Sequence, residues 1–200
     1  TGSGKSTTLF TILDRLNDTE KSLVTLEDPV ERKVEMVRQT QVNPDIGLTF
    51  ASGLRYLLRQ DSDVIMVGEI RDEETAKIAI QAAITGQLVL STIHTNNAIG
   101  AIIRLLNMGI EPFLITSALQ LVTAQRLARA NCKYCKEEYR PPKELARRIK
   151  VAPDTAFYRS QGCPECQYKG VTGRFGIHEV LPVTRKIEDV ILSNPSEEAI

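Results

Sequence analysis

The sequence has no excess of charge of either sign, and this limits the partners that it suggests. Lysine and arginine total 25 residues, and aspartate and glutamate also total 25, so the formal net charge is zero. A dedicated nucleic-acid-binding protein usually carries a basic excess or a basic stripe. The charge balance therefore argues against nucleic acid as a partner.

Long apolar runs are also missing. No run approaches the roughly 20 residues that are needed to span a bilayer. The opening residues, TGSGKSTT, are not a signal peptide, and the chain has no internal repeat or low-complexity tract. We therefore expect a cytoplasmic protein that reaches a membrane only through a partner.

What the sequence does contain is an alternation of strand-like and helix-like segments. Short apolar runs predict strands at 22–26, 64–67 and 88–92. Helical spacing predicts helices at 5–17, 49–59, 97–108 and 112–128, with one more that starts near Asp72. Residues 34–42 alternate imperfectly and suggest an edge hairpin. This order of elements predicts an α/β fold with a mainly parallel sheet.

The composition changes near Ala130, where cysteines, prolines and glycines replace the apolar runs. We place a boundary there. Residues 1–130 are expected to form the α/β core, and residues 131–200 a small cysteine-containing region that ends in a helical segment.

The opening of the chain resembles a phosphate-binding loop. Residues 1–6, TGSGKS, match the end of the pattern G-x-x-x-x-G-K-[ST]. Gly2 and Gly4 let the backbone curl so that N–H groups point at phosphate oxygens, and the following helix directs its dipole at the same anion. Lys5 supplies positive charge to the β- and γ-phosphates, and the Ser6 hydroxyl is suited to bind Mg²⁺. The candidate nucleotide-binding residues are Thr1, Gly2, Ser3, Gly4, Lys5, Ser6 and Thr7.

Two alternatives bear on this loop. A Gly/Ser turn that happens to precede a helix is the simpler explanation of the motif. The first glycine of the pattern, and the strand that normally precedes it, would lie upstream of Thr1. We therefore expect weak or absent ATPase activity from these 200 residues alone.

Acidic residues follow two of the predicted strands. Glu27 ends the run LVTL, and Glu69 follows VIMV and a glycine. Parallel neighbouring strands would bring both carboxylates to the sheet edge where ligands bind in open α/β folds. Hydrolysis needs a held Mg²⁺ and an oriented water, which are tasks for carboxylates. Glu69 stands where an aspartate is usual, and either residue taken singly is also compatible with a solvated loop charge.

One histidine and two arginines complete the candidate catalytic set. His94 closes the strand LVLSTIH, where it is placed to sense the γ-phosphate or to hold the attacking water. A hydrogen-bonded structural histidine is the alternative. Arg55 and Arg59 are four residues apart and so share one helix face. They either pair with nearby acids, such as Asp61 or Glu69, or stabilise transition-state charge within a subunit or across a subunit interface.

The four cysteines form two C-x-x-C pairs. The candidate metal ligands are Cys132, Cys135, Cys163 and Cys166. The 27 residues between the pairs exceed the roughly 15–20 of a usual zinc ribbon. Four thiolates still suit a tetrahedral Zn²⁺. Two disulfides, a redox pair and a nucleic-acid-binding zinc module are the alternatives.

Together these motifs resemble the secretion-motor ATPases, namely the GspE-type enzymes of type II secretion and the PilB-type enzymes of type IV pilus assembly. TGSGKSTTL resembles the family's Walker A motif and TLEDPVE its Asp box. GLTFASGLRYLLRQDSDVIMVGEIRDEETA resembles its arginine-bearing helix and atypical Walker B motif, and TGQLVLSTIHTN its His box. The four cysteines match its tetracysteine motif. Gln87 is a departure, since a histidine is expected there.

The resemblance implies a RecA-like P-loop fold, a homo-hexameric ring, and ATP with Mg²⁺ bound near subunit boundaries. It also implies an inner-membrane platform protein as partner, pseudopilin or pilin subunits as the assembled cargo, and a structural Zn²⁺. The cysteines favour the assembly branch over the retraction branch. It further implies that Glu27 orients or deprotonates water, that Glu69 acts mainly on Mg²⁺ and that His94 reports the phosphate state.

Two other functions remain open at this point. One is a nucleic-acid translocase or recombinase on the same core, with the cysteine region reading DNA. The other is a zinc-stabilised interaction module whose phosphate loop is vestigial.

Overall fold

The computed structural model describes residues 2–152, 154–193, 196, 198 and 200. Their contacts divide the chain into two units. The first unit comprises Thr1–Gln125 and His178–Ile200, and the second comprises Arg126–Ile177. The sequence-based division joined residues 131–200 into one region, whereas the structure groups residues 178–200 with the first unit.

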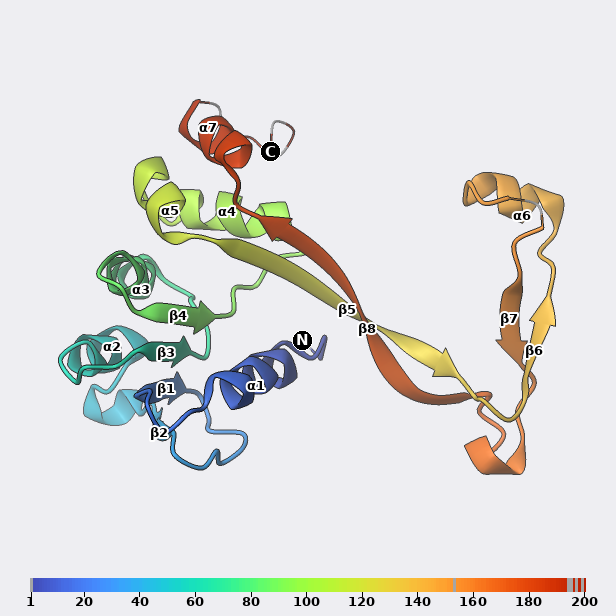
Figure 1. Ribbon diagram of the computed structural model, residues 1–200, viewed down its shortest axis with the longest axis horizontal. Coiled ribbons are helices and arrows are strands. Elements are labelled where there is room, and N and C mark those ends of the chain that lie inside the picture. The colour runs from blue at the N-terminus through green and yellow to red at the C-terminus, as the bar shows by residue number, and fades with distance from the viewer. Residues whose placement is uncertain (1, 153, 194–195, 197, 199) are drawn as a thin grey trace. The chain divides into compact units, whose positions relative to one another are not determined.

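A four-stranded parallel sheet forms the centre of the first unit (Figure 1). Its order is β2 (Arg38–Gln41), β1 (Leu23–Glu27), β3 (Val64–Val67) and β4 (Leu88–Ser91). This confirms the expected α/β fold with a parallel sheet. The hairpin expected at 34–42 is wrong, because residues 28–37 carry the chain back so that β2 pairs with β1 in parallel.

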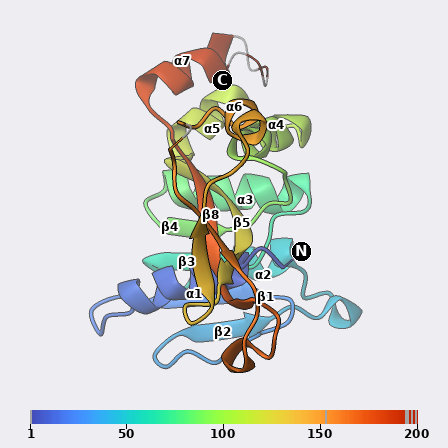
Figure 2. The same cartoon turned by 90° about the vertical axis from the view of Figure 1, so that its right-hand side faces the viewer.

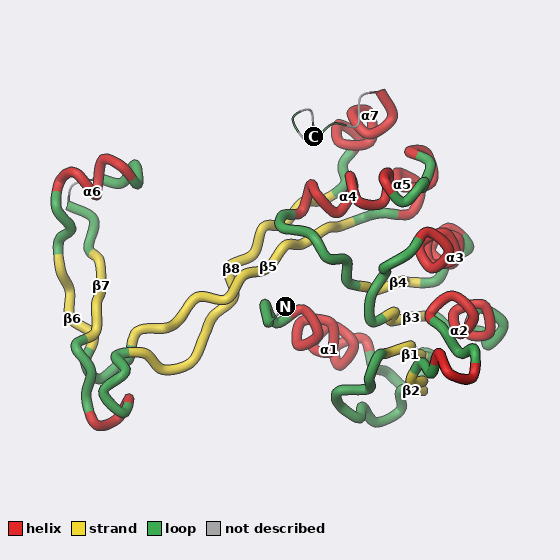
Figure 3. Tube along the Cα trace, turned by 180° about the vertical axis from the view of Figure 1, so that it is seen from behind, coloured by secondary structure: helices red, strands yellow, loops and turns green. Residues whose placement is uncertain are grey.

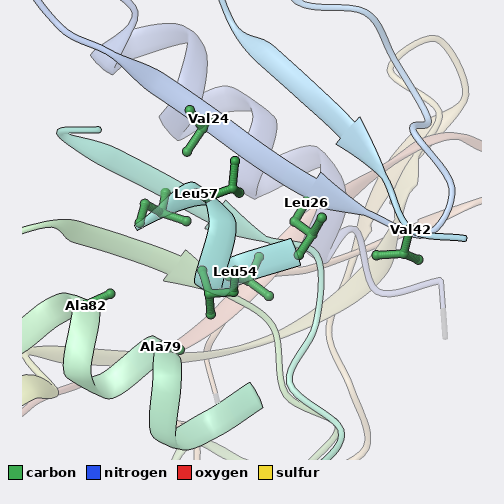
Figure 4. Close-up of a cluster of buried hydrophobic side chains, with 9 residues drawn as sticks. Val24, Leu26, Val42, Leu54, Leu57, Ala79 and Ala82 are labelled. Carbon is green, nitrogen blue, oxygen red and sulfur yellow. The ribbon is translucent and has the colours of Figure 1, made fainter. Parts of the chain in front are cut away.

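Helices cover both faces of this sheet, which explains the continuous apolar runs of β1 and β3. Phe10 and Leu13 of α1 (Lys5–Leu16) pack with Leu23, Val64 and Met66 on one face. The alternate strand residues form a second cluster with α2 (Phe50–Leu57) and α3 (Glu73–Ile84), which Figure 4 shows. The buried side chains of that cluster are Val24, Leu26, Val42, Leu54, Leu57, Ile65, Val67, Ala79 and Ala82.

Side-chain caps set where these helices begin. Thr49 caps α2 in a reciprocal capping box with Ser52, although the helix ends at Leu57 and not near Arg59. The Asp72 carboxylate accepts a hydrogen bond from the Thr75 amide at 2.8 Å and starts α3. A short 3₁₀ helix, η1 (Pro44–Ile46), precedes α2.

The rest of the first unit is a helical cluster. α4 (Ala98–Asn107), α5 (Pro112–Ala118) and α7 (Arg185–Ser193) share a core that includes Ile102, Ile115 and Ile191, and Figure 2 shows α7 beside α5. This packing is why the end of the chain belongs to the first unit.

The helix expected at 112–128 is wrong beyond Ala118. The chain leaves α5 and becomes β5 (Leu121–Asn131), which pairs with β8 (Val171–Pro182) as the trace in Figure 3 shows. The segment LVTAQRLARA is rich in leucine and alanine, so its local preference is helical. Pairing with a distant strand overrides that preference.

The second unit holds a small antiparallel sheet of β6 (Lys136–Tyr139) and β7 (Phe157–Ser160). It also contains α6 (Lys143–Arg148) and a 3₁₀ helix, η2 (Pro164–Cys166). Across the described part of both units, no helix combines the length and hydropathy needed to cross a membrane.

The core around α2 gives a stability prediction. Leu54 is fully buried, whereas Tyr56 on the same helix is 65% exposed. Leu54→Ala should lower the free energy of unfolding by about 2–5 kcal/mol, because it removes buried methyl groups and leaves a cavity. Urea unfolding, with hydrogen exchange at β1 and β3, measures the loss. Tyr56→Ala is the control, and an equal loss in both variants would contradict the assigned packing.

Candidate functional site

A cavity of about 150 Å³ lies where the parallel strands end. It brings together Lys5 and Ser6 from the start of α1, Glu27 from the end of β1, and Glu69 and His94 from the segments after β3 and β4. The remaining lining residues are Leu9, Phe10, Asp28, Pro29, Glu31, Phe50, Met66, Gly68 and Thr92. Five candidate residues spread over 90 positions of sequence therefore share one cavity.

The loop before α1 has the curled backbone that an anion-binding loop needs. Gly2 and Gly4 have φ angles of 79° and 84°, in the left-handed region that favours glycine. The Gly4 carbonyl accepts a hydrogen bond from the Thr8 amide at 3.0 Å, so the loop leads directly into the helix. Lys5 and Ser6 occupy its first turn, where amide groups lack helical partners. Thr1 lies outside the described residues. Of the other candidate nucleotide-binding residues, Gly2, Ser3 and Gly4 in the loop and Thr7 in α1 do not line the cavity.

Glu27 is a buried carboxylate held by neutral donors. Its exposed fraction is only 3%. The Thr25 hydroxyl donates to Glu27 Oε1 at 2.5 Å, and the Gln39 side-chain amide donates to the same oxygen at 3.0 Å. These bonds offset part of the cost of removing the carboxylate from water.

Glu69 is held instead by two basic side chains. An Arg71 guanidinium nitrogen lies 2.5 Å from Glu69 Oε1, and His94 Nε2 lies 3.2 Å from Glu69 Oε2. The Glu69 side chain is 12% exposed. Both carboxylate oxygens are thus engaged, one by each partner.

Burial and these two partners have opposite effects on the pKa of Glu69. Burial by itself raises the pKa, but the hydrogen bond and positive charge of Arg71, aided by His94, hold it below its ordinary value of 4.5. The ionised carboxylate is therefore favoured at neutral pH. Its pairing stabilises the fold above pH 4.5 and loses that effect as the pH falls through the lowered pKa.

Arg55 and Arg59 do not line the cavity. Arg55 is exposed and forms an ion pair with Glu74 on α3, so its partner is not one of the acids expected from the sequence. Arg59 lies just beyond the end of α2 and is also exposed. Both side chains are therefore exposed outside the cavity that holds Glu27 and Glu69.

Sequence reasoning missed three residues around the two glutamates. Arg71 follows Glu69 by two positions, and a search for a cation close to the acid would have found it. Thr25 is two residues before Glu27, on the same face of β1. Gln39 carries no local signal, because its contact with Glu27 depends on β2 pairing with β1.

The four cysteines gather in the second unit. Their sulfur atoms all lie within 4.8 Å of one another, with Sγ–Sγ distances of 3.9 Å for both Cys132–Cys163 and Cys135–Cys166. All four are free thiols. Zn–S bonds of about 2.3 Å in a tetrahedron require sulfur atoms about 3.8 Å apart, which the cluster matches.

Backbone amides polarise this cluster. The Cys163 and Gly170 amides donate to Cys166 Sγ at 3.2 and 3.3 Å. Chiefly through the Cys163 amide, they lower the pKa of Cys166 to about 6, while burial raises the pKa of Cys135 to about 11. Amide donors of this kind orient and stabilise thiolate ligands in metal sites.

The fold and cavity define an α/β protein in which a glycine-containing loop and the start of α1 lie beside two carboxylates. A family model described as "Type II/IV secretion system protein" matches residues 1–200. The chain therefore belongs to the type II/IV secretion system protein family, in agreement with the resemblance of its motifs.

Two individual relatives share about half of their aligned residues with this chain. The type II secretion system ATPase E of Vibrio cholerae is 54% identical over 202 residues, which cover 100% of this chain and 40% of that protein. The type IV pilus assembly ATPase PilB of Thermus thermophilus is 50% identical over 200 residues, covering 98% of this chain and 22% of that protein. The chain thus spans less than half the length of these relatives.

Solved structures agree with the fold. The pilus retraction motor PilT with bound ADP gives a TM-score of 0.71 at 30% identity, covering 98% of this chain and 49% of that chain. The ATPase DotB of Legionella pneumophila gives a TM-score of 0.66 at 25% identity, covering 100% of this chain and 48% of that one.

The pairing of Glu69 gives a pH prediction. Arg71→Gln should raise the titration midpoint of the Glu69 carboxyl, because burial remains while the largest charge that opposes it is lost. Carbon-detected NMR of the side-chain carboxyl, assigned with Glu69→Gln, measures the shift without nucleotide. Arg55→Gln is the control, since Arg55 pairs with Glu74. An unchanged midpoint in Arg71→Gln would show that the ion pair is not formed in solution.

Proposed function

We propose that this chain forms the ATP-hydrolysing core of a motor that drives pseudopilus or pilus assembly in type II secretion or type IV pilus systems. The observation that carries the proposal is the single cavity that unites Lys5 and Ser6 with Glu27 and Glu69. Family membership and the printed names of the relatives support it.

In this proposal the first unit is a RecA-like P-loop core. Residues 1–7 bind the nucleotide phosphates, with Lys5 beside the β- and γ-phosphates. The left-handed glycines and the free amides at the start of α1 suit that role. The Ser6 hydroxyl and Glu69 would hold Mg²⁺, which neutralises charge on the transferred phosphoryl group.

The two glutamates divide the remaining work. Glu27 orients the attacking water or takes its proton. His94, already paired with Glu69, passes the state of the γ-phosphate to the chain that leads into α4. Arg55, on the exposed side of α2, and Arg59, in the turn after it, act where a neighbouring subunit of a hexamer would meet them.

The second unit holds a structural Zn²⁺ in this proposal. Cys132, Cys135, Cys163 and Cys166 would be its ligands, since their sulfur spacing fits a tetrahedral site. Four thiolates leave no open position for water, so the metal would stabilise the unit and take no part in hydrolysis.

The assembly branch is favoured over retraction. Identity is 54% and 50% to the ATPase E and PilB relatives but 30% to PilT, and the clustered cysteines fit the assembly enzymes. An inner-membrane platform protein is the expected partner at the cytoplasmic side of that membrane. A nucleic-acid translocase on the same core is the alternative, and ATP turnover stimulated by DNA but not by the platform protein's cytoplasmic domain would support it.

The proposal predicts separate effects for the two glutamates in the full-length protein. Glu27→Gln should keep ATP and Mg²⁺ binding while turnover falls roughly 10²-fold or more, as expected for loss of a general base or water-positioning group. Glu69→Gln should weaken Mg²⁺ dependence as well as rate. Steady-state ATPase assays across a Mg²⁺ titration measure both.

Two further variants serve as controls for that experiment. Lys5→Ala should abolish turnover, and Glu20→Gln, at an exposed position that does not line the cavity, should leave it unchanged. Equal Mg²⁺ affinity in both glutamate variants, with the larger rate loss at Glu69, would reverse the assigned roles. Turnover that survives Lys5→Ala would reject the ATPase proposal itself.

The cysteine cluster predicts one zinc per chain. Cys132→Ser should abolish stoichiometric zinc and unfold mainly residues 126–177, because metal-binding energy is folding energy in such a unit. Elemental analysis gives the zinc content, and hydrogen exchange locates the unfolding. Zinc should also dissociate as the pH falls, since protons compete for the thiolates.

Tyr134→Ser is the matched control for the cysteine variant. Tyr134 lies between Cys132 and Cys135 and is 65% exposed, so its replacement should retain the metal. Two disulfides and no zinc in protein purified under reducing conditions would refute the assignment.

A further inference from the structure

We infer that Gln39 is a positioning residue for Glu27, and that its side-chain amide fixes which oxygen of that carboxylate is available to the attacking water. The inference rests on the proposed function, because it assigns Gln39 a role in the reaction that Glu27 is proposed to carry. Its basis is a set of hydrogen bonds between β1, β2 and the loop that joins them.

Strand register brings the residues together. Thr25 on β1 pairs with Gln39 on β2, and Glu27 lies two residues beyond Thr25. Side chains at alternate positions of a strand share a face, and directly paired residues of neighbouring strands share it as well. Thr25, Gln39 and Glu27 therefore lie on one face of the sheet, the face that α1 covers.

Both donors reach the same carboxylate oxygen. Thr25 Oγ1 is 2.5 Å from Glu27 Oε1, and Gln39 Nε2 is 3.0 Å from it. Within the described chain, the side-chain hydrogen bonds of Glu27 thus end on Oε1. Oε2 is left as the oxygen that can accept from a water in the cavity, which Glu27 lines. Without these donors the carboxylate of Glu27 would rotate about χ3, a torsion with only weak preferences.

Gln39 is itself oriented by its neighbours. Its Oε1 accepts from the Val34 amide at 2.7 Å, while its Nε2 donates to the Arg32 carbonyl at 2.8 Å as well as to Glu27. An N–H group on one side, and a carbonyl and a carboxylate on the other, allow only one orientation of the amide. Two partners other than Glu27, the Val34 amide and the Arg32 carbonyl, therefore turn the Nε2 donor of Gln39 toward Glu27.

Gln41 supplies a matched comparison. It lies two residues further along β2, and its Oε1 accepts from the Val30 amide at 3.2 Å. Both glutamines therefore hold the loop between β1 and β2 through a side-chain carbonyl, and Gln39 alone of the two donates to Glu27. Gln39 differs from Gln41 in two donated hydrogen bonds, one to Glu27 and one to the Arg32 carbonyl, and the double-variant cycle with Glu27 described below separates these two contributions.

The decisive variant is Gln39→Glu in the full-length protein. Glutamate keeps the size of the side chain and an acceptor for the Val34 amide, but it loses the donor to Glu27 and to the Arg32 carbonyl. We expect kcat to fall about 10-fold or more, as for a misplaced catalytic group. KM and the affinity for a fluorescent ATP analogue should stay near wild type. Gln41→Glu introduces the same charge at the exposed position directly paired with Glu27, but it removes no donor to Glu27, so it controls for charge and should retain wild-type kcat.

Gln39→Ala separates loss of the donor from charge repulsion. If Gln39→Ala lowers kcat as Gln39→Glu does, the missing donor is the cause. If Gln39→Ala retains wild-type kcat, repulsion explains the Glu variant and the inference is overturned. Thermal melting checks the fold of each variant, and should Gln39→Ala unfold, the decision rests on Gln39→Glu with Gln41→Glu as its control.

A double-variant cycle tests whether Gln39 acts through Glu27. In a Glu27→Gln background, Gln39→Glu should reduce kcat no further, because residues that act as a unit are not additive. Full additivity would overturn the inference while leaving the ATPase proposal intact. A wild-type rate in Glu27→Gln alone would instead remove the role proposed for Glu27.

Discussion

The parallel pairing of β1 with β3 is the constraint on which the candidate site depends. Leu26 pairs with Val67 at the end of the two strands, and the Gly68 amide continues the ladder by donating to the Leu26 carbonyl at 2.8 Å. A Cβ on Gly68 would lie 3.3 Å from that carbonyl and 3.5 Å from Glu27 Cα, so a side chain there would press on the neighbouring strand. The glycine lets the two chains stay close past the strand ends. Glu27 and Glu69 reach one cavity for that reason.

The two carboxylates that line the cavity are mostly buried, at 3% exposed for Glu27 and 12% for the Glu69 side chain, so each needs polar partners, and the two have different ones. Glu27 is held by a hydroxyl and an amide, which are neutral donors, whereas Glu69 is held by Arg71 and His94. Neutral donors leave the negative charge of Glu27 in place for a proton or a water. The basic partners of Glu69 occupy both of its oxygens, so a bound cation would have to displace or share them. Binding a divalent ion at Glu69 would thereby alter its contact with His94, which links the ion to the chain that leads into α4.

The sequence predicted those parts of the site that depend on local pattern. Apolar runs that end in an acid gave Glu27 and Glu69, and the parallel sheet followed from the alternation of elements. Gln39 could not be found in this way, since residues 34–42 resemble a hairpin and only the register of β2 against β1 brings the amide to Glu27. The expected helix at 112–128 failed for a related reason, because the partner that makes β5 a strand lies about 50 residues further along the chain. Contacts between distant segments, and not local preference, decide these features.

The two units differ in how much apolar surface they bury, and therefore in what can stabilise them. In the first unit, helices bury both faces of β1 and β3, and every residue that lines the cavity comes from positions 5–94. In the described part of the second unit, the buried apolar side chains are few and small: Cys132, Pro141, Ala146 and Cys166. Such a core supplies little hydrophobic stabilisation, so a metal held by the cysteines would carry much of its folding energy. Loss of such a metal should therefore leave the cavity assembled, because the first unit has its own core and the Thr8 hydroxyl of α1 donates a 2.7 Å hydrogen bond to Gln125 on β5 within that unit.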